Sequence, residues 1–226
     1  MRVHERLKQM SLKKEIDFQQ FVVSCNVKSL PAHFLDITSS SFIVGAKAIC
    51  LQETWLLSNA NLDQFTLPGY TLIPNSVQHG RGIVTYVAKE SPSVYQVTRK
   101  DHQMTLIELE GFNLLNVYRS ATSNQTFFLD DFLKIVDVKR KMLLVGDLNI
   151  CNVSHANHPI LELLSQLMFK HNVTHPTHRE GHHIDYVSHF CPSNSIEKLE
   201  VRQFCQYFTD HDMMIVDTTK LSNEVP

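Results

Sequence analysis

The stretch that most constrains the fold is residues 71–118, in which short β-rich runs follow one another with turn signals such as HGRG and EGFN between them. On both sides of this stretch, strand-like apolar runs alternate with segments of helical periodicity. A β-meander flanked by strand–helix units argues for two packed sheets covered by helices, and against a single doubly wound sheet. The sequence therefore predicts an α/β fold built on two sheets.

The same patterns predict the elements around the meander and the limits of the folded unit. Strands are expected at residues 21–27, 47–53, 141–147, 183–190, 196–204 and 212–220, and helices at residues 31–45, 127–138 and 158–172. One domain is predicted over residues 20–220, since a chain of 226 residues suits one domain of ordinary to large size. Residues 1–19 are expected to form a frayed or helical leader, and residues 221–226 a C-terminal tail.

Composition indicates an ordinary globular protein and limits its setting. The chain is 43% hydrophobic, which is enough for a core, and its net charge of -2 shows no basic excess of the kind typical of nucleic-acid binders, although a local basic patch can coexist with that total. The five cysteines are odd in number and form no CxxC pair, which favours a reducing, intracellular setting over a disulfide framework. The N-terminus lacks the apolar core of a signal peptide, and no apolar stretch is long enough to span a bilayer.

Polar side chains stand where several predicted strands end. Each alone has an ordinary structural explanation, because Asp and Asn commonly cap helices and start turns, and a Tyr in a strand is commonly half-buried packing. Strand ends that meet along one edge of a sandwich would instead bring all of them together. The residues concerned are Asn26, Gln52, Glu53, Tyr118, Asp147, Asn149, Asp185, Asp210 and His211.

The chemistry of this set points to a hard divalent cation. Its ligand atoms are carboxylate and amide oxygens, with no thiolate, and oxygen ligands suit Mg²⁺ or Mn²⁺. A divalent cation beside a His–Asp couple suits phosphodiester hydrolysis, because the cation neutralises developing charge while a carboxylate activates water.

Six motifs occur in order from about residue 20 to residue 218: Asn26, QETW (52–55), Tyr118, GDLN (146–149), IDY (184–186) and TDH (209–211). In this order they resemble the endonuclease/exonuclease/phosphatase superfamily. The stretches ICLQETWL, FTLPGY, GRGIVTYV, NVYRS and PTHREGHHIDYV are more narrowly similar to the apurinic-type endonuclease domains of non-LTR retrotransposons and some Helitron-like elements. The resemblance implies a four-layered α/β sandwich, with two mainly antiparallel sheets face to face, helices outside and the site at one end.

The resemblance also implies which residues hold the metal and the attacking water. Glu53 is expected to be the main metal ligand, with Asn26 next to it and Asp210 near the metal. Asp147 is expected to orient or deprotonate the attacking water. Asn149 is expected to hold that water or a phosphate oxygen.

The remaining matched residues are expected to act on the phosphate. His211 is expected to contact the scissile phosphate, with Asp185 fixing its tautomer and orientation. Tyr118 is expected to touch the phosphate or the departing oxygen. Whether His211 or Asp147 is the general base stays open, since two such groups can titrate as a coupled pair.

The chain departs from classical abasic-site enzymes at one informative position. Those enzymes carry an Asn three residues after the Tyr, where this chain has Ala121. The pair Tyr118-Arg119 instead resembles the transposon group. This favours nicking of ordinary DNA over repair of abasic sites.

Basic residues in or next to predicted loops are expected to contact substrate phosphates, although solvent-exposed surface is the default position for an Arg. They are Arg81, Arg119, Arg179 and His178. The stretch KHNVTHPTHREGHH packs five histidines closely. A zinc site there is disfavoured, because the spacing matches no standard pattern and Pro176 and Gly181 indicate a loop before a strand.

Three functions are weighed from these observations. The leading one is a Mg²⁺- or Mn²⁺-dependent DNA endonuclease of transposon descent that cuts one strand and leaves a 3′-hydroxyl and a 5′-phosphate. The second is a phosphatase acting on lipid headgroups or other small phosphates, and the third is a non-catalytic DNA-binding module. The expected partner is DNA, with no membrane and no obligatory protein partner, and the nucleus is the expected location if chromosomal DNA is the substrate.

Overall fold

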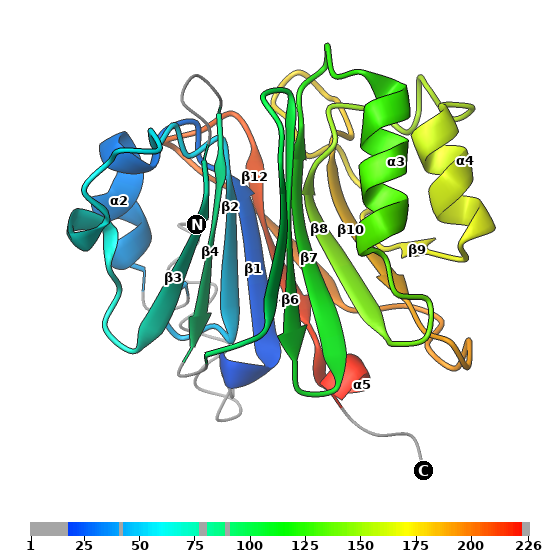
Figure 1. The fold of residues 1–226 in the computed structure, drawn as a ribbon, viewed down its shortest axis with the longest axis horizontal. Helices are drawn as coiled ribbons and strands as arrows, with labels where there is room; N and C mark the ends of the chain where they lie inside the picture. The colour runs from blue at the N-terminus through cyan, green and yellow to red at the C-terminus, as the bar shows by residue number, and fades with distance from the viewer. Residues whose placement is uncertain (1–17, 41–42, 77–80, 89–90, 223–226) are drawn as a thin grey trace.

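Two six-stranded β-sheets, lying face to face, form the centre of the described part of the molecule (Figure 1). This computed structural model describes residues 18–40, 43–76, 81–88 and 91–222. The predicted leader and C-terminal tail therefore fall almost entirely outside the described residues. The predicted α/β sandwich of two sheets is confirmed.

The first sheet, sheet A, has the order β11 (Val201–Cys205), β12 (Asp212–Asp217), β1 (Phe21–Asn26), β2 (Ala48–Gln52), β4 (Ile83–Ala88), β3 (Tyr70–Asn75). Sheet B has the order β5 (Val94–Thr98), β6 (His102–Leu109), β7 (Phe112–Arg119), β8 (Met142–Asp147), β10 (Asp185–Phe190), β9 (Lys170–His171). The helices are η1 (Phe18–Gln20), α2 (Leu30–Thr38), η2 (Leu62–Phe65), α3 (Gln125–Ile135), α4 (Pro159–Gln166) and α5 (Thr219–Ser222). None of these described helices is long and apolar enough to cross a membrane.

Each sheet contains one parallel pair among otherwise antiparallel strands. The parallel pairs are β1 with β2 and β7 with β8. In each case a helix connects the two strands, α2 in the first and α3 in the second, because parallel neighbours need a crossover connection. Both pairs therefore send their carboxyl ends to one edge of their sheet.

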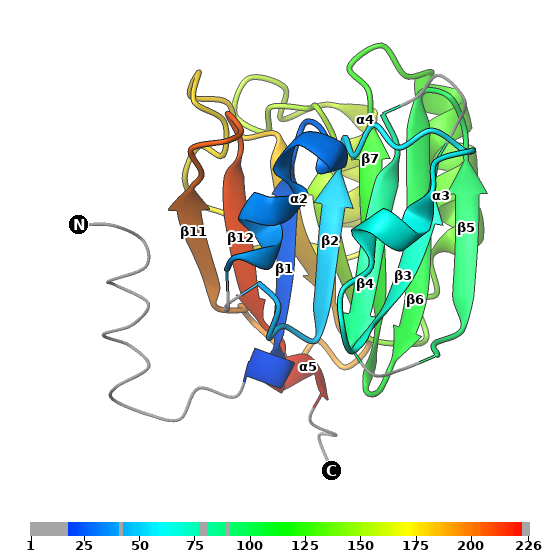
Figure 2. The ribbon, with the colours of Figure 1, turned by 90° about the vertical axis from the view of Figure 1, so that its left-hand side faces the viewer.

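Alternation along the central strands divides the apolar side chains between the inside and the outside of the sandwich. Val22 of β1 and Val145 of β8 belong to one buried cluster between the sheets. Val23, the next residue of β1, packs on the outer face with the buried side of α2, which covers sheet A in Figure 2. Leu144 of β8 packs on the opposite outer face with α3 and α4. The four layers follow from this alternation.

Two predicted helices are shorter than expected. The helix predicted over 31–45 ends at Thr38, where the Ser39 amide bonds back to Leu35 and Ile37. The helix predicted over 158–172 ends at Gln166, because Met168 takes a left-handed backbone conformation with φ of 63°. Residues 170–171 then pair with β10 as the edge strand β9, so tertiary pairing overrides the helical pattern there.

The sheets are also joined by buried polar side chains. Gln52 of sheet A donates to the Asn116 carboxamide oxygen of sheet B at 2.8 Å. Asn116 in turn donates to the Thr85 hydroxyl of sheet A at 3.0 Å. Asn75 on β3 donates across the interface to the Met104 carbonyl oxygen at 2.9 Å. Because buried polar groups are costly when unpaired, these bonds favour one relative placement of the sheets.

Gly146, one residue before the end of β8, is required by a close approach of two backbones. Its φ is 135°, and a Cβ built there would lie 1.9 Å from the Val117 carbonyl oxygen of β7. We expect Gly146→Ala to lower the free energy of unfolding by at least about 3 kcal/mol, since backbone strain and steric overlap add. Urea unfolding followed by circular dichroism measures this loss.

Gly69 supplies the matched control for that substitution. Its φ is also positive, at 81°, but a Cβ there would meet nothing within 4 Å. Gly69→Ala is expected to cost only about 1 kcal/mol. Equal losses in the two variants would show that the close contact with Val117 contributes nothing.

Candidate active site

The predicted site residues meet at one edge shared by both sheets. Asn26 ends β1, and Glu53 follows the end of the parallel strand β2. Asp147 ends β8, and Asp185 begins the antiparallel strand β10 directly opposite it. His211 directly precedes β12, which runs antiparallel to β1 and so starts at the same edge.

Asn26 connects the acids of the two sheets. Its buried amide nitrogen donates to Glu53 Oε1 at 3.0 Å and to Asp147 Oδ2 at 2.9 Å. Its own Oδ1 accepts from the Lys28 amide at 3.2 Å. The two carboxylates are therefore held on either side of a single NH₂ group.

Asp147 is buried and held by two donors. Its second oxygen, Oδ1, accepts from the Asn149 amide at 2.8 Å. Asn149 has a φ of 50° and uses its side-chain NH₂ to bond the Arg119 carbonyl oxygen at 2.8 Å. Burial raises the pKa of Asp147 to about 8, with the negative charge of Asp185 acting in the same direction.

His211 and Asp185 form a buried couple beside Asp147. The imidazole Nδ1 lies 2.9 and 3.1 Å from the two Asp185 oxygens. Burial lowers the pKa of His211, but the hydrogen bond and charge of Asp185 outweigh it, and the pKa is raised to about 9. The imidazole is therefore cationic at neutral pH.

Glu53 is flanked by two side chains that reach it from outside the strands. Arg81 Nη1 lies 2.7 Å from Glu53 Oε1, and the Trp55 indole nitrogen lies 3.4 Å from Oε2. Trp55 is 52% exposed, so about half of its side chain faces solvent. Tyr118 is fully buried nearby, and burial together with the charge of Glu53 raises the pKa of its phenol.

Asp210 lies at the rim and is paired with two cationic or potentially cationic groups. Lys28 Nζ is 2.5 Å from its Oδ2, and His178 Nε2 is 3.1 Å from the same oxygen. Burial acts to raise the pKa of Asp210, but the ammonium of Lys28 lowers it overall. Sequence reasoning missed Lys28, although its place two residues after Asn26 was a signal that it stands at the same edge.

The predicted substrate-binding residues are placed differently from one another. Arg81 and His178 lie beside Glu53 and Asp210, as described above. Arg179 is exposed next to Asp210, with its guanidinium bonded to the Gln206 carbonyl oxygen at 2.8 Å. Arg119 does not join them, since its buried guanidinium donates to the carbonyl oxygens of Leu148 at 3.1 Å and Ser123 at 3.3 Å. Its side chain supports the backbone behind the site.

The donor atoms fit a hard divalent cation. Glu53, Asp147 and Asp210 offer carboxylate oxygens, and Asn26 offers an amide oxygen at the same edge. Asp210 Oδ1 is buried and has no hydrogen-bond partner among the described residues. Burial and the charge of Asp185 raise the pKa of Asp147, so positive charge nearby would stabilise its carboxylate, and oxygen donors of this kind suit Mg²⁺ or Mn²⁺.

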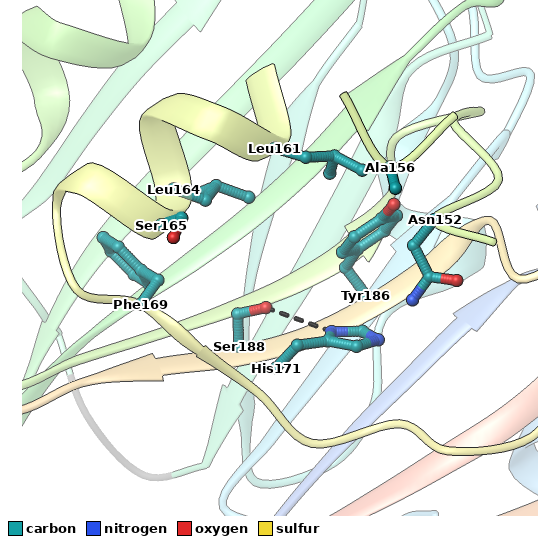
Figure 3. Close-up of a pocket in the computed structure, with 9 residues that line it drawn as sticks. All are labelled: Asn152, Ala156, Leu161, Leu164, Ser165, Phe169, His171, Tyr186 and Ser188. Carbon is teal, nitrogen blue, oxygen red and sulfur yellow. Dashed lines mark hydrogen bonds between the residues drawn. The ribbon is translucent and has the colours of Figure 1, made fainter. Parts of the chain in front are cut away.

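A separate cavity of about 250 Å³ lies between α4 and sheet B (Figure 3). Leu161 and Leu164 of α4 cover it, and Tyr186 and Ser188 of β10 form its floor. Tyr186 directly follows Asp185, so its side chain points to the opposite face of the strand. The acids therefore face away from this cavity, and the site at the strand ends is the better candidate for chemistry.

Comparison with solved structures places the fold. The endonuclease domain of TRAS1, a telomere-specific non-LTR retrotransposon, superposes with a TM-score of 0.65 at 16% identity, over 90% of this chain and 99% of that one. An AP endonuclease from Archaeoglobus fulgidus also has a TM-score of 0.65, at 14% identity, over 87% of this chain and 98% of that one. The Xenopus laevis APE2 catalytic domain gives 0.65 as well, at 15% identity over 87% and 90%.

The chain has the fold of the endonuclease/exonuclease/phosphatase superfamily. A scan against protein-family models found no match, and neither did a search of curated protein sequences. The fold of this superfamily is thus preserved at sequence identities near 15%. The resemblance inferred from six short motifs is confirmed at the level of the fold.

The raised pKa values of Asp147 and His211 predict a pH-dependent stability. The folded protein binds more protons than the unfolded chain at Asp147 between pH 3.8 and about pH 8, and at His211 between pH 6.5 and about pH 9. The free energy of unfolding contributed by these groups is therefore lost as the pH rises. We expect stability in EDTA to fall most steeply between about pH 6.5 and 8, where both windows overlap.

Asp147→Asn tests this assignment because it removes one of the two titrations. Its free energy of unfolding, measured by urea unfolding from pH 6 to pH 9, is expected to fall less steeply than that of the wild type. Asp130→Asn on the exposed face of α3 is the matched control and should keep the wild-type slope. A wild-type slope in Asp147→Asn would remove Asp147 from this account.

Proposed function

We propose that this protein is a divalent-metal-dependent phosphodiesterase, and most specifically a DNA endonuclease that nicks one strand to leave a 3′-hydroxyl and a 5′-phosphate. The observation that carries the proposal is the Asn26 amide joining Glu53 and Asp147 beside the His211–Asp185 couple. Metal-binding acids, a buried carboxyl and an oriented imidazolium are the groups that phosphodiester hydrolysis needs.

The metal would be held by Glu53, with Asn26 and Asp210 at the same edge. Bound there, Mg²⁺ or Mn²⁺ supplies positive charge to the oxygens of the scissile phosphate. The Asn26 amide orients the Glu53 carboxylate for this task.

The raised pKa of His211 favours Asp147 over His211 as the general base. A cationic His211 cannot accept a proton at neutral pH, so it stabilises negative charge on the phosphate, with Asp185 fixing its orientation. Asp147 is then the base that accepts the proton of the attacking water, because the positive charge of a bound cation would lower its raised pKa and favour the ionised carboxylate. Asn149 holds that water or a phosphate oxygen, and Tyr118 contacts the phosphate or the departing 3′ oxygen.

The rim of the site suits a nucleic-acid backbone. Lys28, Arg81, His178 and Arg179 place basic groups around the acids despite the net charge of -2. Trp55 adds a half-exposed aromatic ring that can stack on a base or sugar. The similarity to a retrotransposon endonuclease domain supports DNA as the substrate and transposon descent for the chain.

A phosphatase acting on small phosphorylated molecules is the second candidate. One similar structure is described as a 3′ phosphatase from Neisseria, at 14% identity and a TM-score of 0.63. A cluster that activates water toward a phosphodiester also suits the hydrolysis of a phosphomonoester. The substrate decides between these proposals.

Substitution of the two central groups tests the proposed function. We expect His211→Ala to lower the rate of plasmid nicking by about 10²- to 10⁴-fold, because it removes the group that stabilises charge on the phosphate. Glu53→Gln is expected to cause a loss of similar size. Conversion of supercoiled plasmid to open circles, with Mg²⁺ or with EDTA, measures both.

Glu197→Gln is the control, since this Glu is exposed in the connection between β10 and β11, away from the strand ends that carry the site. Circular dichroism and melting curves must show that all variants fold. An intact plasmid with well-folded wild-type protein would reject the endonuclease proposal and direct the assay to small phosphorylated substrates. Nicking that survives Glu53→Gln would instead reject the assigned metal site.

A further inference from the structure

Beside the oxygen-rich acids lies a second group of ligand atoms with a different chemistry. His178 Nε2 is 3.1 Å from Asp210 Oδ2, and His211 Nε2 is 3.8 Å from Asp210 Oδ1. One ligand atom from each of the three side chains lies within 4.8 Å of the others. Three ligands of a tetrahedral zinc ion are about 3.3 Å apart, given bond lengths of ~2.0–2.1 Å. Small side-chain movements are enough to reach that spacing.

The backbone holds these residues together across a long sequence separation. His178 and His211 form an isolated β-bridge, and the Arg179 amide donates to the Asp210 carbonyl oxygen at 2.9 Å. The Asp212 amide donates to the Thr177 carbonyl oxygen at 2.8 Å. The ring centroids of His178 and His211 lie 4.9 Å apart, and the two ring planes are inclined at 78° to each other. The histidine-rich loop is therefore fixed against the start of β12, a placement that spacing within the loop does not reveal.

Two features prepare the group for a cation. Asp185 binds Nδ1 of His211, so zinc would bind Nε2 and release the Nε2 proton to solvent, and Asp185 supplies the carboxylate partner that metal-bound histidines usually have. Asp210 Oδ1 is buried without a hydrogen-bond partner among the described residues. This orphaned oxygen is a carboxylate acceptor that a metal ion would satisfy.

We propose that His178, Asp210 and His211 form a zinc site beside the Mg²⁺ site at Glu53, with Asp210 standing between the two. Two imidazoles and one carboxylate suit Zn²⁺, whereas the carboxylates and amide around Glu53 suit Mg²⁺ or Mn²⁺. Three protein ligands leave the fourth zinc position to water. The class of ligand is therefore a borderline-soft divalent transition-metal ion.

Two present contacts must change when zinc binds. Lys28 moves off Asp210, and its side chain, which is 40% exposed on a flexible stem, is free to do so. His178 carries its proton on Nδ1 when Nε2 binds zinc, so it loses the 3.3 Å bond that Nδ1 accepts from the Glu180 amide. Because Lys28 is paired with Asp210, its positive charge opposes the binding of a zinc ion there.

The site regulates the reaction if the proposed function is right, and this consequence alone rests on that function. Zinc at Nε2 takes His211 away from the scissile phosphate. Zinc therefore inhibits hydrolysis even at saturating Mg²⁺. Zinc acts here as an inhibitor that occupies one catalytic side chain.

Direct binding tests the site without reference to activity. Titration calorimetry of Glu53→Gln protein with Zn²⁺ is expected to show one equivalent bound. Adding His178→Gln should weaken binding by more than the roughly 10- to 100-fold that loss of an outer-shell partner costs. His175→Gln, at an exposed histidine in the same loop, should leave it unchanged, and Lys28→Gln should strengthen it. Equal affinities in the His178 and His175 variants would overturn the proposal.

Cobalt substitution and plasmid nicking complete the test. Co²⁺ in the site should give the visible spectrum of nitrogen and oxygen ligation, and a thiolate charge-transfer band would assign the metal to a cysteine and overturn the site. If the wild-type protein nicks plasmid, each variant's nicking rate with zinc is compared with its own rate without zinc. The zinc concentration that halves the rate should be higher for His178→Gln than for the wild type, and unchanged for His175→Gln. A protein that binds zinc through His178 but cleaves nothing would refute the proposed function and leave the zinc site standing.

Discussion

The two hydrogen bonds donated by the Asn26 side chain are the constraint on which the site depends. One goes to Glu53 of the same sheet, and the other crosses to Asp147 of the facing sheet. A single NH₂ group has two hydrogens, so both are used, and neither acid can move without leaving a buried donor unpaired. The separation of the two sheets at this edge is thereby tied to the position of the acids, and the polar pair Gln52–Asn116 repeats the device deeper in the interface.

The sequence predicted the strands and the acids because both depend on local pattern. The apolar run that ends in Gly146 and Asp147 predicts a buried strand from the local sequence alone. The structure brings Asp147 together with Asn26, Glu53, Asp185 and His211 as expected. The family's fold then sets the order of strands. No knowledge of the partner sheet was needed to see that polar groups cluster at strand ends.

What the sequence could not predict depends on long-range packing. Arg119 was expected at the substrate, but its side chain turns inward to carbonyl oxygens that only the folded chain supplies. Lys28 and His178 reach Asp210 from positions 182 and 32 residues away, and no local pattern encodes such a meeting. The overlong helix predicted to residue 172 failed for the same reason, because the edge strand β9 exists only where β10 offers a partner.

The placement of β1 next to β12 also determines when the site can form during synthesis. β1 is made well before β12, its neighbour in sheet A, which pairs Asp217 with Phe21 from almost two hundred residues later in the chain. Until that last strand arrives, β1 has an unpaired edge, and His211 has not yet joined the acids. Contacts this distant in sequence form slowly. A nascent chain in which β12 has not yet docked therefore holds an incomplete site, whatever the length of chain already made.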